Sequence, residues 1–188
     1  EVVEECLDIG IQAPTGSNSQ TYHFVLVTDP EVKKPIADFY RNNFFAFYGG
    51  DGATTSPYAA DDPRTDRLEA VVDSATYLAN RLHEVPVWVI PCMEGRMGEG
   101  SPSFMQASLW GSIMPAVWSF MLASRERALG TVWTTLHLPQ EQEAAELLGI
   151  PFDSVTQVGL IPVAYTSGTD FKAASRVSAA DRTHWDQW

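Results

Sequence analysis

The sequence predicts a single α+β domain that spans residues 1–188. Apolar residues recur at helical spacing, most clearly between Leu68 and Leu82. Continuous apolar runs such as 85–92 instead have the length and composition of buried strands. Helical and strand segments mix without strict strand–helix–strand alternation, and neither an internal repeat nor a domain linker is visible. This combination favours α+β over a parallel α/β fold.

The first forty residues predict a helix, a loop, a strand and a second helix. Apolar residues at helical spacing indicate an amphipathic helix that begins at the start of the chain and ends near Pro14. The loop Thr15–Ser19 is rich in turn formers. The apolar run 23–27 is typical of a short strand, and Pro30 is expected in the first turn of the second helix.

The regular pattern fails between residues 42 and 64, where glycines and prolines interrupt it. Residues 44–58 are nevertheless unusually aromatic, so we expect them to pack over something. The segment is either a lid or substrate-pocket wall, or a plain loop packed on the core.

The second half of the chain predicts three helices and three extended segments. The helices are expected at 68–82, 103–128 and 140–148, with Gly130 capping the second of them and Gly149 ending the third. The extended segments are expected at 85–92, at 131–135 and at 155–165, the last interrupted at Pro162. A polar tail follows from Thr166 to Trp188.

Charge and cysteine content exclude several classes of function. Acidic residues outnumber basic ones by 24 to 12, which gives a formal net charge of −12. A surface this negative repels nucleic acid and anionic lipid, so we expect neither as a partner. Two cysteines are too few for a disulfide framework and lack the spacing of metal ligands. A reducing, cytoplasmic setting is therefore expected.

The long uncharged segment Ser101–Ser124 is not expected to cross a membrane. Six serines, a glutamine and a proline dilute its hydrophobicity, and charged residues follow at once. We expect a helix buried in a core or a subunit interface. No signal-peptide pattern opens the chain, whose first residues already read as the middle of a helix, so we expect upstream residues to be missing.

No set of side chains for hydrolysis, nucleophilic attack or metal binding is recognisable. The four histidines are far apart in sequence, and no GxSxG or Walker motif occurs. The glycines at 95, 98 and 100 are in the wrong order for a dinucleotide loop, and Cys92 ends a buried strand as an inert thiol. This points to a cofactor that brings its own chemistry, or to no chemistry.

Four segments together resemble the FMN-dependent nitroreductase family. They occur in the family's order and cover nearly the whole chain: IQAPTGSNSQ (11–20) before the strand FVLV (24–27), RALGTVWTT (127–135), LLGIP (147–151) with VGLIPVAY (158–165), and a tail with Lys172, Arg176 and HWDQW (184–188). The resemblance implies a central mixed sheet flanked by helices. It also implies a homodimer with two FMN sites at the interface, the uncharged helix supplying the dimer core.

The chain departs from the family pattern in two places. The family's arginine-rich RRSxR segment, which grips the FMN phosphate, is not in this sequence. Where the family often has a glutamine on the central helix, this chain reads Pro115-Ala116-Val117-Trp118.

The resemblance assigns cofactor-binding roles to three groups of residues and assigns no catalytic side chain and no metal ligand. Next to the flavin ring it places Pro14, Thr15, Gly16, Asn18 and Gln20, together with Gly130 and Thr131; for the phosphate it offers Lys172 and Arg176. Amide side chains can complement the donors and acceptors of a flavin edge. The residues alone leave other interpretations open: Asn18 stabilises a turn, Pro14 stops a helix, Gly130 caps one, and the two cations form an ordinary surface pair.

The activity that the resemblance implies is hydride transfer from NAD(P)H through flavin N5 to an electron-poor small molecule with a nitro, quinone or enone group. The alternatives are a flavin-binding or sequestering protein without turnover, or another activity of this scaffold, such as dehalogenation or oxygen-dependent flavin chemistry. Trp110, Trp118 and Trp133 are expected in the core or an interface. Trp185 and Trp188 are expected to dock on a partner subunit.

Overall fold

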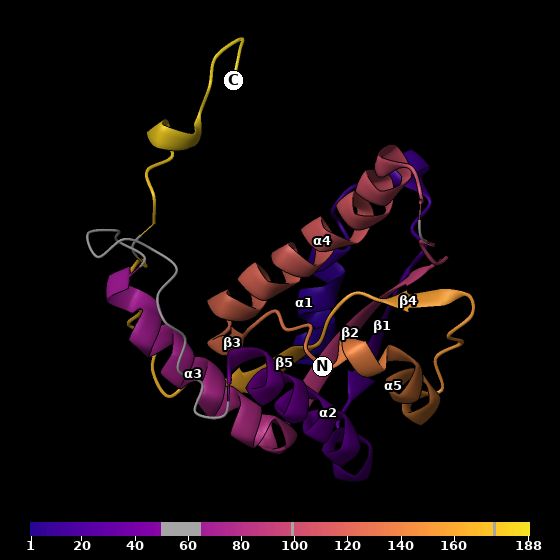
Figure 1. Ribbon diagram of the computed structural model, residues 1–188, viewed down its shortest axis with the longest axis vertical. Helices are drawn as coiled ribbons and strands as arrows, with labels where there is room; N and C mark the ends of the chain where they lie inside the picture. Colours follow the sequence, from indigo (N-terminus) through magenta and orange to yellow (C-terminus); the bar gives the residue numbers. More distant parts are fainter. Residues whose placement is uncertain (50–64, 99, 175) are drawn as a thin grey trace.

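Helices cover both faces of a five-stranded sheet in the computed structural model, which describes residues 1–49, 65–98, 100–174 and 176–188 (Figure 1). The described strands are β1 (Tyr22–Val27), β2 (Val87–Glu94), β3 (Leu129–Thr131), β4 (Val155–Gln157) and β5 (Ile161–Tyr165). The described helices are α1 (Val2–Gly10), α2 (Pro30–Tyr48), α3 (Leu68–Arg81), α4 (Ser103–Glu126) and α5 (Glu141–Leu148).

The sheet has the strand order β1-β2-β5-β3, and β4 also pairs with β2. β2 is the central strand, with β1 along one edge and β4 and β5 along the other. The α+β class and the helix-flanked sheet are confirmed. The pairings between the described strands are all antiparallel, whereas the resemblance implied a mixed sheet.

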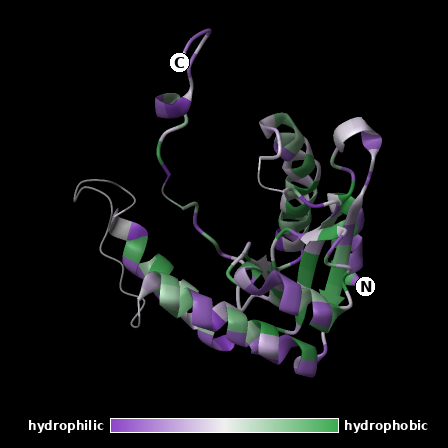
Figure 2. Ribbon diagram, turned by 45° about the vertical axis from the view of Figure 1, so that its right-hand side comes forward, coloured by the Kyte–Doolittle hydropathy of each residue, from purple (hydrophilic) through white to green (hydrophobic). Residues whose placement is uncertain are grey.

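Alternation along β2 divides the hydrophobic core into two layers. Trp88, Ile90 and Cys92 pack with α2, α3 and α5, whereas Val89 and Met93 pack with α1 and α4. Successive side chains of a strand point to opposite faces, so one strand with apolar residues at every position supports both layers. Figure 2 shows much of the sheet in the green of hydrophobic residues.

α1 lies directly against α4 and ends earlier than the sequence predicts. A Cβ on Gly10 would lie 2.7 Å from the carbonyl oxygen of Ala116, so glycine allows the two backbones to approach closely. The helix ends at Gly10 rather than near Pro14. α4 itself matches the predicted uncharged helix.

Two further sequence expectations about the elements were wrong. α2 continues through the residues from 42 onward to Tyr48, because Ile36, Tyr40 and Phe44 recur every four residues and bury one face of the helix. The segment 155–165 breaks between β4 and β5, at 158–160, and not at Pro162, because Leu160 pairs with Thr134 there. The expectation for 44–58 is tested only as far as residue 49, since 50–64 lie outside the described residues.

Within the described ranges, no helix is both long enough and apolar enough to cross a membrane. The same residues contain no group of three or more histidine, cysteine or acidic side chains that could hold a metal ion.

Candidate functional site

The loop Thr15–Gln20 carries four of the predicted cofactor contacts, with a fifth at Pro14 just before it, and hydrogen bonds join the loop to the middle of α4. The Gly16 amide donates a hydrogen bond to the Ser112 hydroxyl at 2.9 Å, and Ser112 in turn donates to the Ser108 carbonyl at 2.7 Å. The Gln20 amide donates to the Thr15 hydroxyl at 3.1 Å and closes the loop on itself. Pro14 is exposed just beyond α1.

Three residues of this loop have left-handed backbone angles although none is glycine. Ser17, Asn18 and Gln20 have φ values of 53°, 53° and 51°. Left-handed conformations cost side-chain-bearing residues roughly 1 kcal/mol each, so the hydrogen bonds to Ser112 and Thr15 hold the loop in a shape that it would not adopt alone. Such strain is typical of functional loops.

The side chains of Asn18 and Gln20 are exposed and paired. Gln20 Nε2 donates to Asn18 Oδ1 at 3.1 Å. The Asn18 side chain therefore bonds another side chain and not its own backbone. This differs from the interpretation in which Asn18 only stabilises a turn. Each amide keeps further donor and acceptor capacity for a ligand.

A cavity of about 290 Å³ opens between this loop and the N-terminal half of α4. Gly16 and Ser19 line it from the loop, and Phe104, Ser108 and Ser112 line it from the helix. Its walls are mainly apolar, with hydroxyl groups from the serines.

The expected role of Gly130 as the helix cap was wrong. α4 ends at Glu126, and Ala128 takes the left-handed angle, with φ of 59°. Gly130 instead lies in β3 opposite Ala164. A Cβ there would lie 3.0 Å from the methyl group of Thr166, so glycine is needed for close strand contact.

Gly130 and Thr131 line a second cavity, of about 330 Å³, alongside the C-terminal half of α4. Arg125 and Phe171 line it as well, and the Arg125 guanidinium lies 3.2 Å from the centre of the Phe171 ring. Arg125 is a cation at this site that sequence reasoning missed. The sequence could have indicated this role, because Arg125 lies in the last turn of the long helix, shortly before Gly130.

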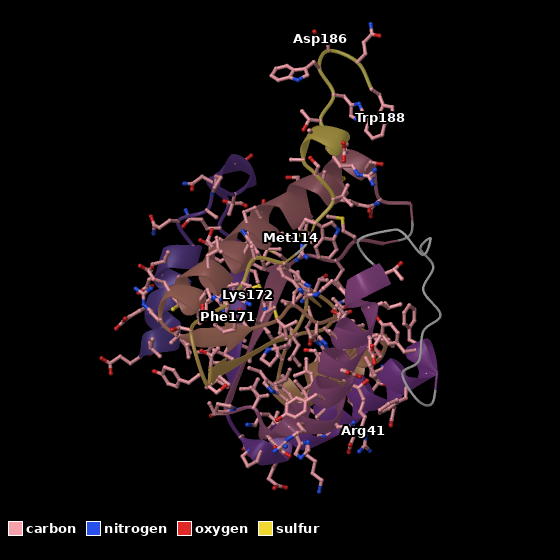
Figure 3. The ribbon with its side chains drawn as sticks, turned by 90° about the vertical axis from the view of Figure 1, so that its left-hand side faces the viewer. Arg41, Met114, Phe171, Lys172, Asp186 and Trp188 are labelled. Atoms are coloured by element: carbon pink, nitrogen blue, oxygen red, sulfur yellow. The ribbon has the colours of Figure 1, made fainter. Side chains whose placement is uncertain are left out.

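The two predicted phosphate-binding cations lie on the tail that leaves this cavity. Lys172 follows Phe171 directly and is exposed (Figure 3). Arg176 is exposed further along the tail. The rest of the tail extends away from the sheet and helices to Trp188 (Figures 1 and 2).

One chain does not bring all the predicted residues around a common cavity. Gly16 contacts α4 at Ser112, whereas β3 begins after its last turn, so the two groups are about 20 Å apart along the helix axis. The structure brings Gly130 and Thr131 together with Phe171, the residue before Lys172. It keeps this group apart from Asn18 and Gln20.

An exposed apolar face of α4 connects the two cavities. Phe104, Met114, Trp118 and Leu122 are between 48% and 74% exposed. Trp110 and Trp133, by contrast, pack against the core as expected. Exposed large apolar side chains in a row mark an interaction surface.

The nucleophilic and acid–base candidates near the core are unsuited to catalysis. Burial raises the pKa of the Cys92 thiol to about 12, so the thiol stays protonated. Burial also lowers the pKa of His137 to about 4, with nearby Gln157 and Glu141 opposing that shift more weakly. Both side chains are buried, at 1% and 0% exposure, so neither meets a substrate.

Comparison with known proteins gives one family. The family model described as "Nitroreductase family" matches residues 1–165. The chain is 28% identical over 146 residues to Protein DrgA of Synechocystis sp., a match that covers 78% of this chain and 64% of DrgA. The chain thus spans less than two thirds of that curated relative.

Solved structures share the fold at low identity. A FMN- and NADPH-dependent nitroreductase, NfnB from Sphigopyxis sp. strain HMH, has a TM-score of 0.67 and 17% identity, covering 100% of this chain and 89% of NfnB. An iodotyrosine deiodinase bound to FMN and 3-iodo-L-tyrosine has a TM-score of 0.65 and 23% identity, and the match covers 94% of this chain and 83% of the deiodinase chain. A BluB-like flavoprotein from Clostridium difficile 630 has a TM-score of 0.64 and 15% identity, and the match covers 99% of this chain and 89% of the flavoprotein chain. The helix-flanked sheet and the match over residues 1–165 therefore lead to one conclusion: the chain belongs to the nitroreductase family.

Proposed function

We propose that this protein is an FMN-dependent oxidoreductase that passes electrons from NAD(P)H to an electron-poor small molecule with a nitro, quinone or enone group. The observation that carries the proposal is the apolar face of α4, which ends at one cavity lined by Gly16 and at another lined by Gly130. Family membership and the FMN in the iodotyrosine deiodinase structure support it.

The apolar face of α4 supports a homodimer. A two-fold axis near Met114, in the middle of the helix, would bring two copies of α4 together in antiparallel orientation. The Gly16 cavity of one copy would then lie beside the Gly130 cavity of the other. Each cavity alone is at or below the lower end of the size range of small-molecule sites, whereas the two joined would be large enough for a cofactor.

FMN fits this composite site by the chemistry of its donors. Asn18 and Gln20 would present amide donors and acceptors to the ring edge. Gly130 and Thr131 line the other half of this site and would contact the ring there.

The phosphate of FMN requires cations in a protein whose net charge is −12. Lys172 and Arg176 would bind it, together with Arg125 at the same end of α4. FMN, when bound, supplies the hydride chemistry that no described side chain supplies.

The overall reaction balances without a catalytic side chain. For a nitro acceptor, NAD(P)H, one proton and the nitro compound give NAD(P)⁺, the nitroso compound and water, with two electrons transferred. The protein would contribute positioning and an oriented hydrogen-bond frame. Two buried free thiols suit a reducing, cytoplasmic compartment.

Absorption spectroscopy tests the proposal. The purified protein, or the protein reconstituted with FMN, should be yellow and should bleach anaerobically when NADH or NADPH is added. An acceptor such as a nitroaromatic or a quinone should then restore the colour. Stable yellow protein that neither nucleotide bleaches would favour a flavin-binding protein without this reductant, and protein that takes up no FMN would overturn the proposal.

A further inference from the structure

A large cavity among the described residues contains none of the residues that the sequence assigned to the cofactor, but Phe47 and Tyr48 of the aromatic segment 44–58 line it. It has a volume of about 840 Å³ and lies between the C-terminal end of α2, one face of α3 and the segment 132–136. This volume is within the usual range for small-molecule sites.

One face of α3 lines this cavity, and only part of that face, at Ala75 and Leu78, also packs against the core. Val71 and Tyr77 line the cavity and are 56% and 64% exposed, and within the described part of α3 only Ala79 is fully buried. The helical stripe that is so clear in the sequence is thus only partly used for packing. An apolar helix face that is left open over a cavity suits an apolar ligand.

Arg67 is the charged side chain among the described residues that line the cavity, and no carboxylate is among them. The other lining residues include the aromatic rings of Tyr40, Phe47, Tyr77 and Trp133. In a chain with twice as many acidic as basic residues, a cavity with one guanidinium and no acid selects for an anion.

The cavity adjoins the segment that we propose for flavin contact. Val132, which lines the cavity, directly follows Thr131 of β3. This cavity and the proposed flavin site therefore meet at consecutive backbone residues, Thr131 and Val132.

We propose that this cavity is the acceptor site and that it selects an electron-poor aromatic compound carrying a negative charge, such as a carboxylate or phenolate. The ring packs against the aromatic and aliphatic lining, and the anion pairs with the Arg67 guanidinium. This inference rests on the proposed function, because it assigns the substrate class of the same reaction.

The test compares two nitro compounds that differ by one carboxylate. Steady-state kcat/KM is measured with NAD(P)H for 4-nitrobenzoate and for nitrobenzene, in the wild type, in Arg67→Gln and in Arg41→Gln. The wild type should prefer 4-nitrobenzoate. Arg67→Gln should lower kcat/KM for 4-nitrobenzoate about tenfold or more, chiefly through KM, and should change that for nitrobenzene less than about twofold.

Arg41→Gln is the matched control, because it removes one exposed cation from α2 outside the cavity. It should leave kcat/KM unchanged for both 4-nitrobenzoate and nitrobenzene. Equal effects of Arg67→Gln on both substrates, or a wild type that prefers nitrobenzene, would overturn the inference.

A binding measurement separates this inference from the proposed function. Titration calorimetry with 2-naphthoate, which cannot be reduced here, should show binding to the wild type and to Arg41→Gln, and binding about tenfold weaker to Arg67→Gln. This holds even for a protein that fails to turn over nitro compounds. Equal binding of 2-naphthoate to all three proteins, or no binding to the wild type, would contradict the anion site.

Discussion

The hydroxyl of Ser112 connects the candidate flavin loop to α4. It is nearly buried, accepts from the Gly16 amide and donates within the helix. Ser112→Ala leaves the Gly16 amide without this acceptor, so we expect a loss of about 1 kcal/mol in the free energy of unfolding, measured in urea. We also expect weaker FMN binding, because the left-handed residues of the loop lose an anchor.

Ser108→Ala is the control for this change. It removes a hydroxyl from the same cavity one turn earlier but keeps the bond between Ser112 and the Ser108 carbonyl. Ser108→Ala should leave stability within about 0.5 kcal/mol of the wild type. Equal stability and equal FMN affinity in both variants would show that the loop does not depend on Ser112.

At the scale of the element, α4 is a core helix on one face and an open apolar surface on the other. Trp118 lies on the open face and is 58% exposed in one chain. Trp118→Glu should therefore preserve the fold, seen by circular dichroism, and should place a charge in the proposed dimer interface. We expect monomers by light scattering at micromolar concentration and at least tenfold weaker FMN binding, because each site needs both copies.

Gln142→Glu on α5 makes the same change in net charge at an exposed position away from α4. It should remain dimeric and bind FMN normally. A Trp118→Glu protein that is still a dimer with unchanged FMN affinity would contradict the antiparallel arrangement.

At the scale of the whole molecule, buried His137 makes stability depend on acid. Its pKa is about 4 in the folded chain and 6.5 when unperturbed, because burial opposes the charged form. As the pH falls from 6.5 to 4, the unfolded chain binds a proton that the folded chain does not, so the free energy of unfolding decreases. The loss is on the order of 3 kcal/mol and is complete below pH 4.

His137→Gln removes this titration and keeps a polar side chain at the position. Denaturant unfolding at pH 7 and pH 4 should show a smaller loss of stability in the variant than in the wild type. Carboxylates affect both proteins alike, so the difference between the two losses isolates the histidine. Parallel losses in the two proteins would assign the acid sensitivity to other groups.

The sequence predicts local features of this molecule better than contacts between distant segments. The uncharged run that becomes α4 and the apolar run of β2 were recognisable, because periodicity and composition are local. The C-terminal part of α2 was missed because its glycine- and proline-rich continuation hid the spacing of Tyr40 and Phe44. Gly130 was wrongly predicted to cap α4 because Ala128 has the left-handed backbone angle there. Alanine rarely adopts that angle.

The candidate site is only half visible from the sequence for a related reason. The turn-forming residues around Asn18 predict a loop, but no local sequence pattern indicates that the hydroxyl of Ser112 binds it. The cavity lined by Arg67 depends on α3, α2 and the segment after β3 meeting in space. Sequence patterns report which face of each helix is apolar, and not which apolar face remains open.

The two tryptophans at the end of the tail give this protein a built-in optical reporter. Trp185 and Trp188 are 86% and 103% exposed, whereas Trp88 is sealed inside the sheet–helix layer. Water-exposed indoles emit at longer wavelengths than buried ones and are quenched selectively by iodide. If a second copy or another surface covers the tail, the tryptophan emission should shift to shorter wavelength and iodide should quench it less, without any added label.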